Sequence, residues 1–207
     1  MNLFDDLQLD LNNIVCHSGG AEGSDTYWET IGAKFGVKTK AYSYKTDYHK
    51  SSNKVEISEE DFKEGIREIK KANTHLNRYS IDKYINLLSR NWAQVKYSSQ
   101  IFAIGQIVDP GKRGSKGYYS KSKYQSVDGG TGYCCQMAIN NFKDVLIFDQ
   151  NNLIWFRWSY ITMSFIQLKE VPKITTQNFA GVGTRSIASD GIKAIEDVYL
   201  NTFNVLP

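Results

Sequence analysis

The chain has no long apolar run and contains little cysteine and histidine. None of its stretches approaches the ~18 apolar residues that a membrane-spanning helix needs, so no membrane association is expected. Cys16, Cys134 and Cys135 are an odd number, and adjacent cysteines rarely form a disulfide. We therefore expect free thiols and a cytoplasmic location. The three histidines lack metal-ligand spacing and no HExxH or CxxC motif is present, so neither a metal nor a cofactor is predicted.

The composition is that of an ordinary globular protein. Hydrophobic residues make up 41% of the 207 positions and charged residues 23%, which excludes a disordered or fibrous chain. The net charge of +3 is too small to indicate a nucleic-acid partner by itself. Residues 1–13 are acidic and amphipathic, unlike a secretory signal. We expect a single domain over residues 1–207.

Apolar segments that predict strands alternate with segments that predict helices. Strands are expected at 14–18, 37–44, 100–108, 145–149 and 176–181, and helices at 24–35, 59–72, 80–95, from Gly132 to about Phe142, and at 188–202. The alternation predicts an α/β fold, namely a Rossmann-like, doubly wound, mostly parallel sheet with helices on both faces. An aromatic hairpin at about 150–172, toward the C-terminus, is expected as an antiparallel addition.

Three glycine-rich turns join predicted strands to predicted helices, at 18–25, 128–132 and 181–185. Ligands bind at the carboxyl ends of parallel strands, where glycine admits a phosphate and a helix N-terminus supplies N–H donors. The alternative is that these glycines only permit tight turns. We predict one pocket for an anionic nucleotide. The expected binding residues are Ser18, Gly19, Gly20, Gly23, Ser24, Asp25, Arg90, Asn91, Gln94, Gly129, Gly130, Thr131, Gly132, Gly183, Thr184 and Arg185.

Several of these residues have a second interpretation. Arg185 is expected to hold a phosphate or carboxylate, but it could form a surface salt bridge instead. Arg90, with Asn91 and Gln94, offers hydrogen bonds to phosphate, ribose and base, and the alternative for Arg90 is a helix C-cap. Asp25 is expected either to cap a helix or to contact a ribose hydroxyl.

The loop at 109–128 is basic and aromatic. It suits a mobile lid over an anionic ligand, a nucleic-acid contact or a solvated loop. Five cations are few for a duplex-binding surface, so we favour the lid and do not expect a nucleic-acid partner. The residues concerned are Lys112, Arg113, Lys116, Lys121 and Lys123, with Tyr118, Tyr119 and Tyr124 between them.

Large aromatic residues also gather in the predicted hairpin. Trp155, Phe156 and Trp158 occupy alternating and adjacent positions. Aromatic side chains are enriched both in cores and at interfaces, so these residues are expected to form part of the core and part of a subunit interface. A homo-oligomer, a dimer or larger, is therefore predicted, with the hairpin or the helix at 80–95 contributing to the interface.

The glycine turns also carry a family resemblance. The pattern Ser18-Gly19-Gly20-Ala21-x-Gly23-x-Asp25 resembles the SGGAxGAD motif of the SLOG superfamily, which includes LOG-type phosphoribohydrolases and DprA-like Rossmann domains. The turn Gly181-x-Gly183-Thr184-Arg185 resembles the GxGSR turn of that group. Segments 90–95 and 129–132 resemble motifs of phage-borne members. The resemblance covers about residues 14–149 and 176–203.

The order of these motifs differs from that of the family. The GxGSR strand comes first in relatives, whereas its counterpart lies near the C-terminus here. The resemblance therefore implies a circular permutation, which is physically permissible where chain ends lie close together. We accordingly expect residues 1–13 and 203–207 to be neighbours.

The resemblance further implies binding without turnover. LOG enzymes carry a GGxGTxxE pattern whose glutamate assists N-glycosidic cleavage, and alignment on Gly129 places Gln136 at that position. Glutamine cannot act as a general acid or base. The implied function is sequestration of a nucleotide-derived signal of the ADP-ribose type, such as cyclic ADP-ribose, by a phage anti-defence sponge in the host cytoplasm. The alternatives are a phosphoribohydrolase or nucleoside hydrolase acting through Glu22 or Asp25, and a DprA-like single-stranded DNA binder using the basic loop.

Overall fold

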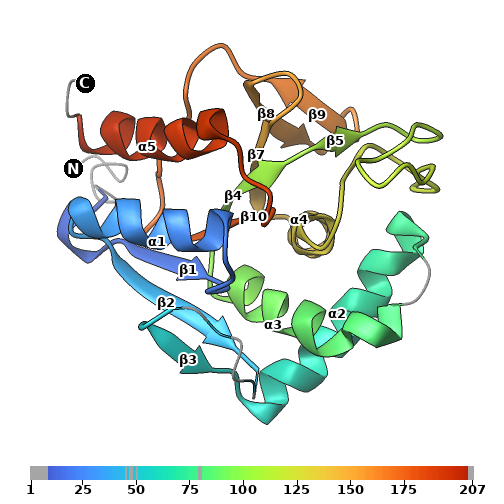
Figure 1. Ribbon diagram of the computed structural model, residues 1–207, viewed down its shortest axis with the longest axis horizontal. Helices are drawn as coiled ribbons and strands as arrows, with labels where there is room; N and C mark the ends of the chain where they lie inside the picture. Colours follow the sequence, from blue (N-terminus) through green and yellow to red (C-terminus); the bar gives the residue numbers. More distant parts are fainter. Residues whose placement is uncertain (1–8, 45, 47–48, 50, 79–80, 205–207) are drawn as a thin grey trace, which may run out of the picture.

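The protein contains an eight-stranded sheet. Figure 1 shows this sheet crossing the molecule. The computed structural model describes residues 9–44, 46, 49, 51–78 and 81–204. Six neighbouring strands are parallel, and two antiparallel strands follow at one edge. The order across the sheet is β3 (Lys54–Glu56), β2 (Lys38–Ser43), β1 (Val15–Ser18), β10 (Asn178–Gly183), β4 (Gln100–Gly105), β7 (Asp144–Asp149), β8 (Ile154–Ser159) and β9 (Ser164–Gln167).

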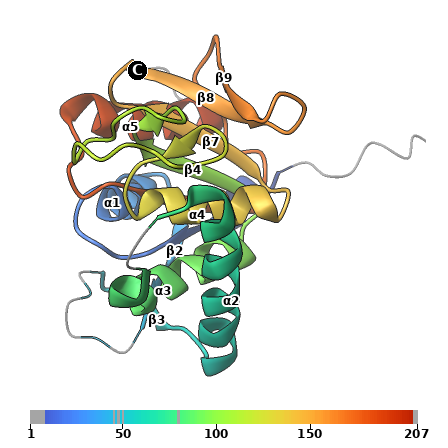
Figure 2. The same ribbon diagram turned by 90° about the vertical axis from the view of Figure 1, so that its right-hand side faces the viewer.

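Helices cover both faces of this sheet (Figures 1 and 2). One face carries α1 (Ser24–Lys34) and α5 (Ser189–Phe203), and the other carries α2 (Glu59–Leu76), α3 (Ile85–Lys96) and α4 (Thr131–Asn140). The predicted Rossmann-like, doubly wound α/β fold is confirmed. Among the residues that the structure describes, no helix is both long and apolar enough to cross a membrane.

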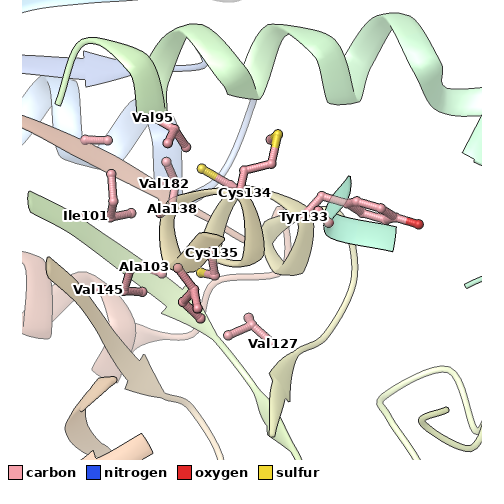
Figure 3. Packing of buried hydrophobic residues seen from close by; sticks show 14 of the residues in the cluster. Val95, Ile101, Ala103, Val127, Tyr133, Cys134, Cys135, Ala138, Val145 and Val182 are labelled. Atoms are coloured by element: carbon pink, nitrogen blue, oxygen red, sulfur yellow. The ribbon is translucent and has the colours of Figure 1, made fainter. Parts of the chain in front are cut away.

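Successive side chains of a strand point to opposite faces, and this divides the core in two. In β4, Ile101 and Ala103 pack under α2, α3 and α4, whereas Phe102 and Ile104 pack under α1 and α5. Figure 3 shows part of the first cluster. Cysteines occur in both clusters, and all three are buried and free, as expected. Burial raises the pKa of the Cys135 thiol to about 12, which leaves it in the unreactive protonated form.

Two helices and two strands differ from the expected limits. α2 extends to Leu76 rather than ending at 72, and a 3-10 helix (Ile81–Tyr84) precedes α3, which begins at Ile85. The Ser58 side chain accepts a hydrogen bond from the Asp61 amide at 3.0 Å and caps α2, as serine commonly does at this position. The expected strand 100–108 divides after Gly105, because the following residues turn away and pair as β5 (Ile107–Val108) with β6 (Ser126–Val127). Strand β3 lies within a polar stretch where no strand was expected.

The last strand of the chain lies in the middle of the sheet. β10 is hydrogen-bonded to β1 on one side and to β4 on the other. Near the two chain ends, Leu9 and Phe203 pack against the same core cluster, and the Gln177 side chain donates to the Asp10 carbonyl oxygen at 2.9 Å. The sequence predicts that residues 1–13 and 203–207 are neighbours. Residues 1–8 and 205–207 lie outside the described part of the chain.

The aromatic hairpin is present as β8 and β9. Trp155 packs edge-on against Phe102, and Trp158 packs against Phe165 with ring centroids 5.0 Å apart. Both indoles are buried, so they serve the core of this chain. The expected interface at this hairpin stays a prediction.

Candidate functional site

A cavity of about 330 Å³ lies at the carboxyl ends of β1 and β2. Its wall combines the first glycine turn, the residues that follow β2, one side of α3 and the end of the third turn. The lining residues are Gly19, Gly20, Ala21, Glu22, Ser43, Tyr44, Thr46, His49, Leu87, Arg90 and Arg185. Four of the predicted binding residues, Gly19, Gly20, Arg90 and Arg185, therefore meet at one cavity.

The first and third glycine turns touch through their backbones. Both the amide and the hydroxyl of Ser24 donate to the Thr184 carbonyl oxygen, at 3.1 and 2.8 Å. Gly23 has φ +98°, and a Cβ atom there would lie 2.6 Å from the Arg185 Cα. A Cβ on Gly183 would lie 2.5 Å from the Ser24 side chain. Glycine is required because no side chain fits between the turns.

A buried arginine lies directly against the first turn. Arg90 and Asp25 are only 7% and 5% exposed, and Arg90 Nη1 lies 3.9 Å from Asp25 Oδ2. This distance allows Coulomb attraction but no hydrogen bond. A Cβ on Gly19 would collide with the guanidinium and lie 2.5 Å from the Asp25 carboxylate. Arg90 lies in the middle of α3, which continues to Lys96, so the C-cap interpretation is wrong.

The Arg90 guanidinium is not fully paired within the described residues. Its Nη2 donates to Asn91 Oδ1 at 3.3 Å, and its Nε has no hydrogen-bond partner there. Burial lowers the pKa of Arg90, although an arginine remains protonated in proteins. A buried cation with a spare donor that lines a cavity is suited to an anion.

Asp25 joins the turn to helix α1 rather than lining the cavity. Its Oδ2 accepts a hydrogen bond from the Ala21 amide at 3.4 Å. Burial raises the pKa of Asp25 to about 6, and the nearby Arg90 charge opposes that shift. The capping interpretation is wrong, because Gly23 is the N-cap of α1 and no side chain caps that helix. A contact with a ribose hydroxyl stays a prediction.

Ser18 supports the first turn from behind. Its hydroxyl donates to Glu29 Oε1 at 2.8 Å and accepts from the Gly20 amide at 3.1 Å. Ser51 also donates to the Glu29 carboxylate. This buried carboxylate therefore ties β1, α1 and the segment after β2 together.

The segment after β2 forms a wall that sequence reasoning missed. His49 Nε2 donates to the Tyr42 carbonyl oxygen at 3.3 Å, and Nδ1 accepts from the Ser51 amide at 3.3 Å. Gly20 has φ +60°, and a Cβ there would collide with the His49 ring. Ser43 and Tyr44 could have been found, because they lie at the carboxyl end of a predicted strand. Nothing local marks His49, Thr46 or Leu87.

Arg185 is exposed at the end of β10, where it lines the cavity. No carboxylate lies within ion-pair distance of it among the residues described, so the salt-bridge interpretation has no support. Its side chain is therefore available to an anion from outside.

The remaining glycine turn, 128–132, has different surroundings. Arg78 donates to the carbonyl oxygens of Gly129 and Val127, at 2.6 and 2.5 Å. A Cβ on Gly132 would overlap the Val127 carbonyl oxygen. None of the residues in this turn lines the cavity, namely Gly129, Gly130, Thr131 and Gly132.

Three other residues singled out in the sequence lie outside the cavity wall. Asn91 and Gln94 are buried in α3, and Gln94 Nε2 has no hydrogen-bond partner among the residues described. Gln136, at the position of the LOG glutamate, donates to Asn140 Oδ1 at 2.9 Å.

Three further observations bear on the site. A larger hollow of about 410 Å³ lies between the hairpin and α5, but it contains none of the predicted binding residues. Within the described residues, no group of three or more histidine, cysteine or acidic side chains could hold a metal ion. None of the described residues of the basic loop lines the 330 Å³ cavity, and its role as a lid stays a prediction.

Comparisons with known proteins give no independent identification. No family model, no curated protein and no solved structure matches this chain.

Proposed function

We propose that the chain binds a nucleotide-derived anion in the 330 Å³ cavity and sequesters it without turnover. The observation that carries the proposal is the Arg90 guanidinium, which is buried, incompletely paired and placed beneath a glycine turn, with Arg185 also lining the cavity. The ligand class we favour is ADP-ribose-type, with cyclic ADP-ribose as the first candidate. The biological role would be that of a phage anti-defence sponge acting in the host cytoplasm.

The chemistry of the wall supports an anionic ligand. Arginine forms strong charge-assisted hydrogen bonds to phosphate, and a glycine turn lets the backbone approach closely. The cavity volume falls within the range of about 300–1,000 Å³ that is usual for small-molecule sites. Tyr44 adds an aromatic ring to the wall.

Membership of the SLOG superfamily, in circularly permuted form, belongs to the same proposal. Its support is that β10, which carries the GxGTR turn, lies beside β1, which carries the SGGAxGxD turn. The two turns are thus neighbours in space although they are far apart in the sequence.

Sequestration without turnover is supported by the positions of Gln136 and Asp25, although Glu22 does line the cavity. Gln136 supplies no proton, lies outside the cavity wall and is engaged with Asn140. The Asp25 carboxylate is engaged by the Ala21 amide and lies close to Arg90.

The test is incubation with cyclic ADP-ribose and with ADP-ribose, followed by removal of free ligand, heat denaturation and chromatography. We expect intact ligand to be released only on denaturation, and Arg185→Ala to retain much less of it. Catalytic formation of free base or ribose phosphate would overturn the sponge.

One observation favours a hydrolase as the second candidate. Glu22 lines the cavity, so its carboxylate lies where a general acid would have to act. If turnover is found, Glu22→Gln and Asp25→Asn identify the acid that is responsible.

We also propose a homo-oligomer in which the hairpin contributes contacts. Tyr160, Ile161 and Ile166 expose apolar surface there, and Ile161 is 95% exposed. Light scattering at micromolar concentration should give at least a dimeric mass, and a monomeric mass would contradict this part of the proposal.

A further inference from the structure

The hollow of about 410 Å³ between the β8–β9 hairpin and α5 is a second place for a ligand. Helix α5 contributes residues 190, 193, 194 and 197, whose spacing places them on one face of the helix. Residues 167–171, at the end of β9 and just after it, form another part of the lining. No residue lines both this hollow and the 330 Å³ cavity, so the two are separate.

Part of the lining of this hollow is apolar. Trp155 and Ala194 are buried, and Leu168 and Val171 are partly buried within the same core cluster. Trp155 meets Phe148 edge-on, with ring centroids 5.7 Å apart. The hollow therefore offers aromatic and aliphatic surface that suits an apolar side chain.

Trp155 also has an unused hydrogen-bond donor. This residue is only 5% exposed, and its Nε1 has no hydrogen-bond partner among the residues described. A buried N–H group without a partner is unfavourable, because it has lost its hydrogen bonds to water. An acceptor oxygen on a ligand in the hollow would supply that partner.

Charged groups of both signs line the same hollow. Lys193 donates to both carboxylate oxygens of Asp197, at 2.8 and 3.0 Å, so these two charges are paired with each other. Lys169, Glu170 and Asp190 are exposed and have no ion-pair partner among the described residues. A ligand that carries both a cation and an anion therefore finds an unpaired partner for each.

We propose that this hollow binds a free α-amino acid whose side chain is apolar. The ligand side chain would pack against Trp155 and Leu168, and the ammonium group would pair with Asp190 or Glu170. The carboxylate would accept hydrogen bonds from Lys169 and from Trp155 Nε1.

Other small ligands match the lining less well. An amine without a carboxylate leaves Lys169 and the indole N–H unpaired, and a carboxylate without an amine leaves both Asp190 and Glu170 unpaired. An interior segment of a peptide has neither charge on its backbone. A free amino acid carries both charges a short distance from its side chain, as the lining requires.

The test is isothermal titration calorimetry with L-phenylalanine and L-leucine. The analogues 2-phenylethylamine and 3-phenylpropionate each lack one charged group. We expect saturable binding of both amino acids and about tenfold weaker binding of either analogue, the scale of one charge-assisted hydrogen bond. The Glu170→Gln/Asp190→Asn double variant and Lys169→Gln should each bind L-phenylalanine about tenfold more weakly. Trp155→Phe, which keeps an aromatic ring but loses the N–H, should also weaken binding.

Matched controls change the same kinds of group outside the hollow. Glu60→Gln/Glu196→Gln removes two exposed acids, and Lys34→Gln removes an exposed lysine. Trp158→Phe removes another buried indole N–H that has no partner among the described residues. All three controls should bind L-phenylalanine like the wild type.

The outcome does not depend on the nucleotide proposal. Arg185→Ala should bind L-phenylalanine like the wild type, so a failure of either proposal can be recognised separately. Absence of saturable binding at millimolar concentration, equal affinity for 2-phenylethylamine and L-phenylalanine, or full affinity in the double acid variant would each overturn the amino-acid site. Equal losses in Trp155→Phe and Trp158→Phe would overturn the role of the indole N–H.

Discussion

Glycine turns 18–25 and 128–132 both lie between a strand and a helix, and their local sequences predict the same use. In the first turn, the chain leaves Gly19 and Gly20 facing a cavity, with the buried Arg90 beneath them. In the second turn, the protein's own side chains occupy the surroundings, because Arg78 holds two carbonyl oxygens and Asp128 holds Ser115.

The difference shows that a glycine turn alone does not make an anion site. A ligand site also needs an unfilled volume and a cation whose donors are not already used. Arg90 keeps Nε unpaired among the described residues, whereas Arg78 uses Nη1 and Nη2 on the backbone. In the proposed function Arg90 therefore serves the ligand, whereas Arg78 serves the structure of the second turn.

The largest expected effect is on the stability of the second turn. In Gly132→Ala, the new Cβ would overlap the Val127 carbonyl oxygen and lie 2.8 Å from Arg78 Nη2. We expect the free energy of unfolding to fall by about 3 kcal/mol, the upper part of the range for overpacking. Urea unfolding measures this change. Gly129→Ala, which meets no neighbour but has φ +64°, should cost about 1 kcal/mol. Equal stabilities of the two variants would contradict the structural role.

The next effect separates the two turns by ligand binding. Arg185→Ala should weaken the binding of ADP-ribose by about 1.5–3 kcal/mol, because a charge-assisted hydrogen bond is lost. Arg78→Ala should leave the affinity unchanged and lower only the stability. Isothermal titration calorimetry on both folded variants gives the comparison. A larger affinity loss in Arg78→Ala would move the site to the second turn.

A pH dependence should distinguish the first turn. The raised pKa of Asp25 means that it becomes negative as the pH rises through about 6. The pyrophosphate of ADP-ribose should then be repelled, and affinity should fall by about 1 kcal/mol between pH 5 and 7.5. Asp25→Asn should lose this dependence. A profile identical in Asp25→Asn and wild type would exclude Asp25 as the cause.

The titration of Asp25 also makes the free energy of unfolding depend on pH. The folded-state pKa of Asp25 is raised above its unfolded value of 3.8. The contribution of Asp25 to stability is therefore fully present below pH about 4 and is lost as the pH rises through about 6. Urea unfolding of wild type and Asp25→Asn across this window should show the difference.

The smallest expected effect concerns Gly130. A Cβ there would meet only Leu88 Cδ2, at 4.0 Å, so Gly130→Ala should change stability by a few tenths of a kcal/mol. Ligand binding should stay unchanged in this variant and in the bulkier Gly130→Leu. If Gly130→Leu abolishes binding while the fold is intact, the second turn approaches a phosphate after all.

Much of the fold follows from the sequence, because its causes are local. The alternation of apolar strands and amphipathic helices predicts the layered sheet, and Ser58 marks the start of α2 through its own side chain. Gly19, Gly20 and Arg185 could likewise be predicted as cavity residues, since turns at the carboxyl ends of parallel strands lie at one edge.

Tertiary structure alone decided which glycine turn lines a cavity. That outcome depends on side chains brought from distant elements, such as Arg90 from α3 to the first turn and Arg78 from the end of α2 to the second. It also depends on strand order, because β10 pairs with β1 and this brings Thr184 into hydrogen-bond contact with Ser24. Local sequence patterns extend over a few residues, whereas these contacts join segments dozens of residues apart. The physical reason is that an anion site needs polar and charged groups that have no partner in the surrounding structure. Only the packed chain determines which groups these are.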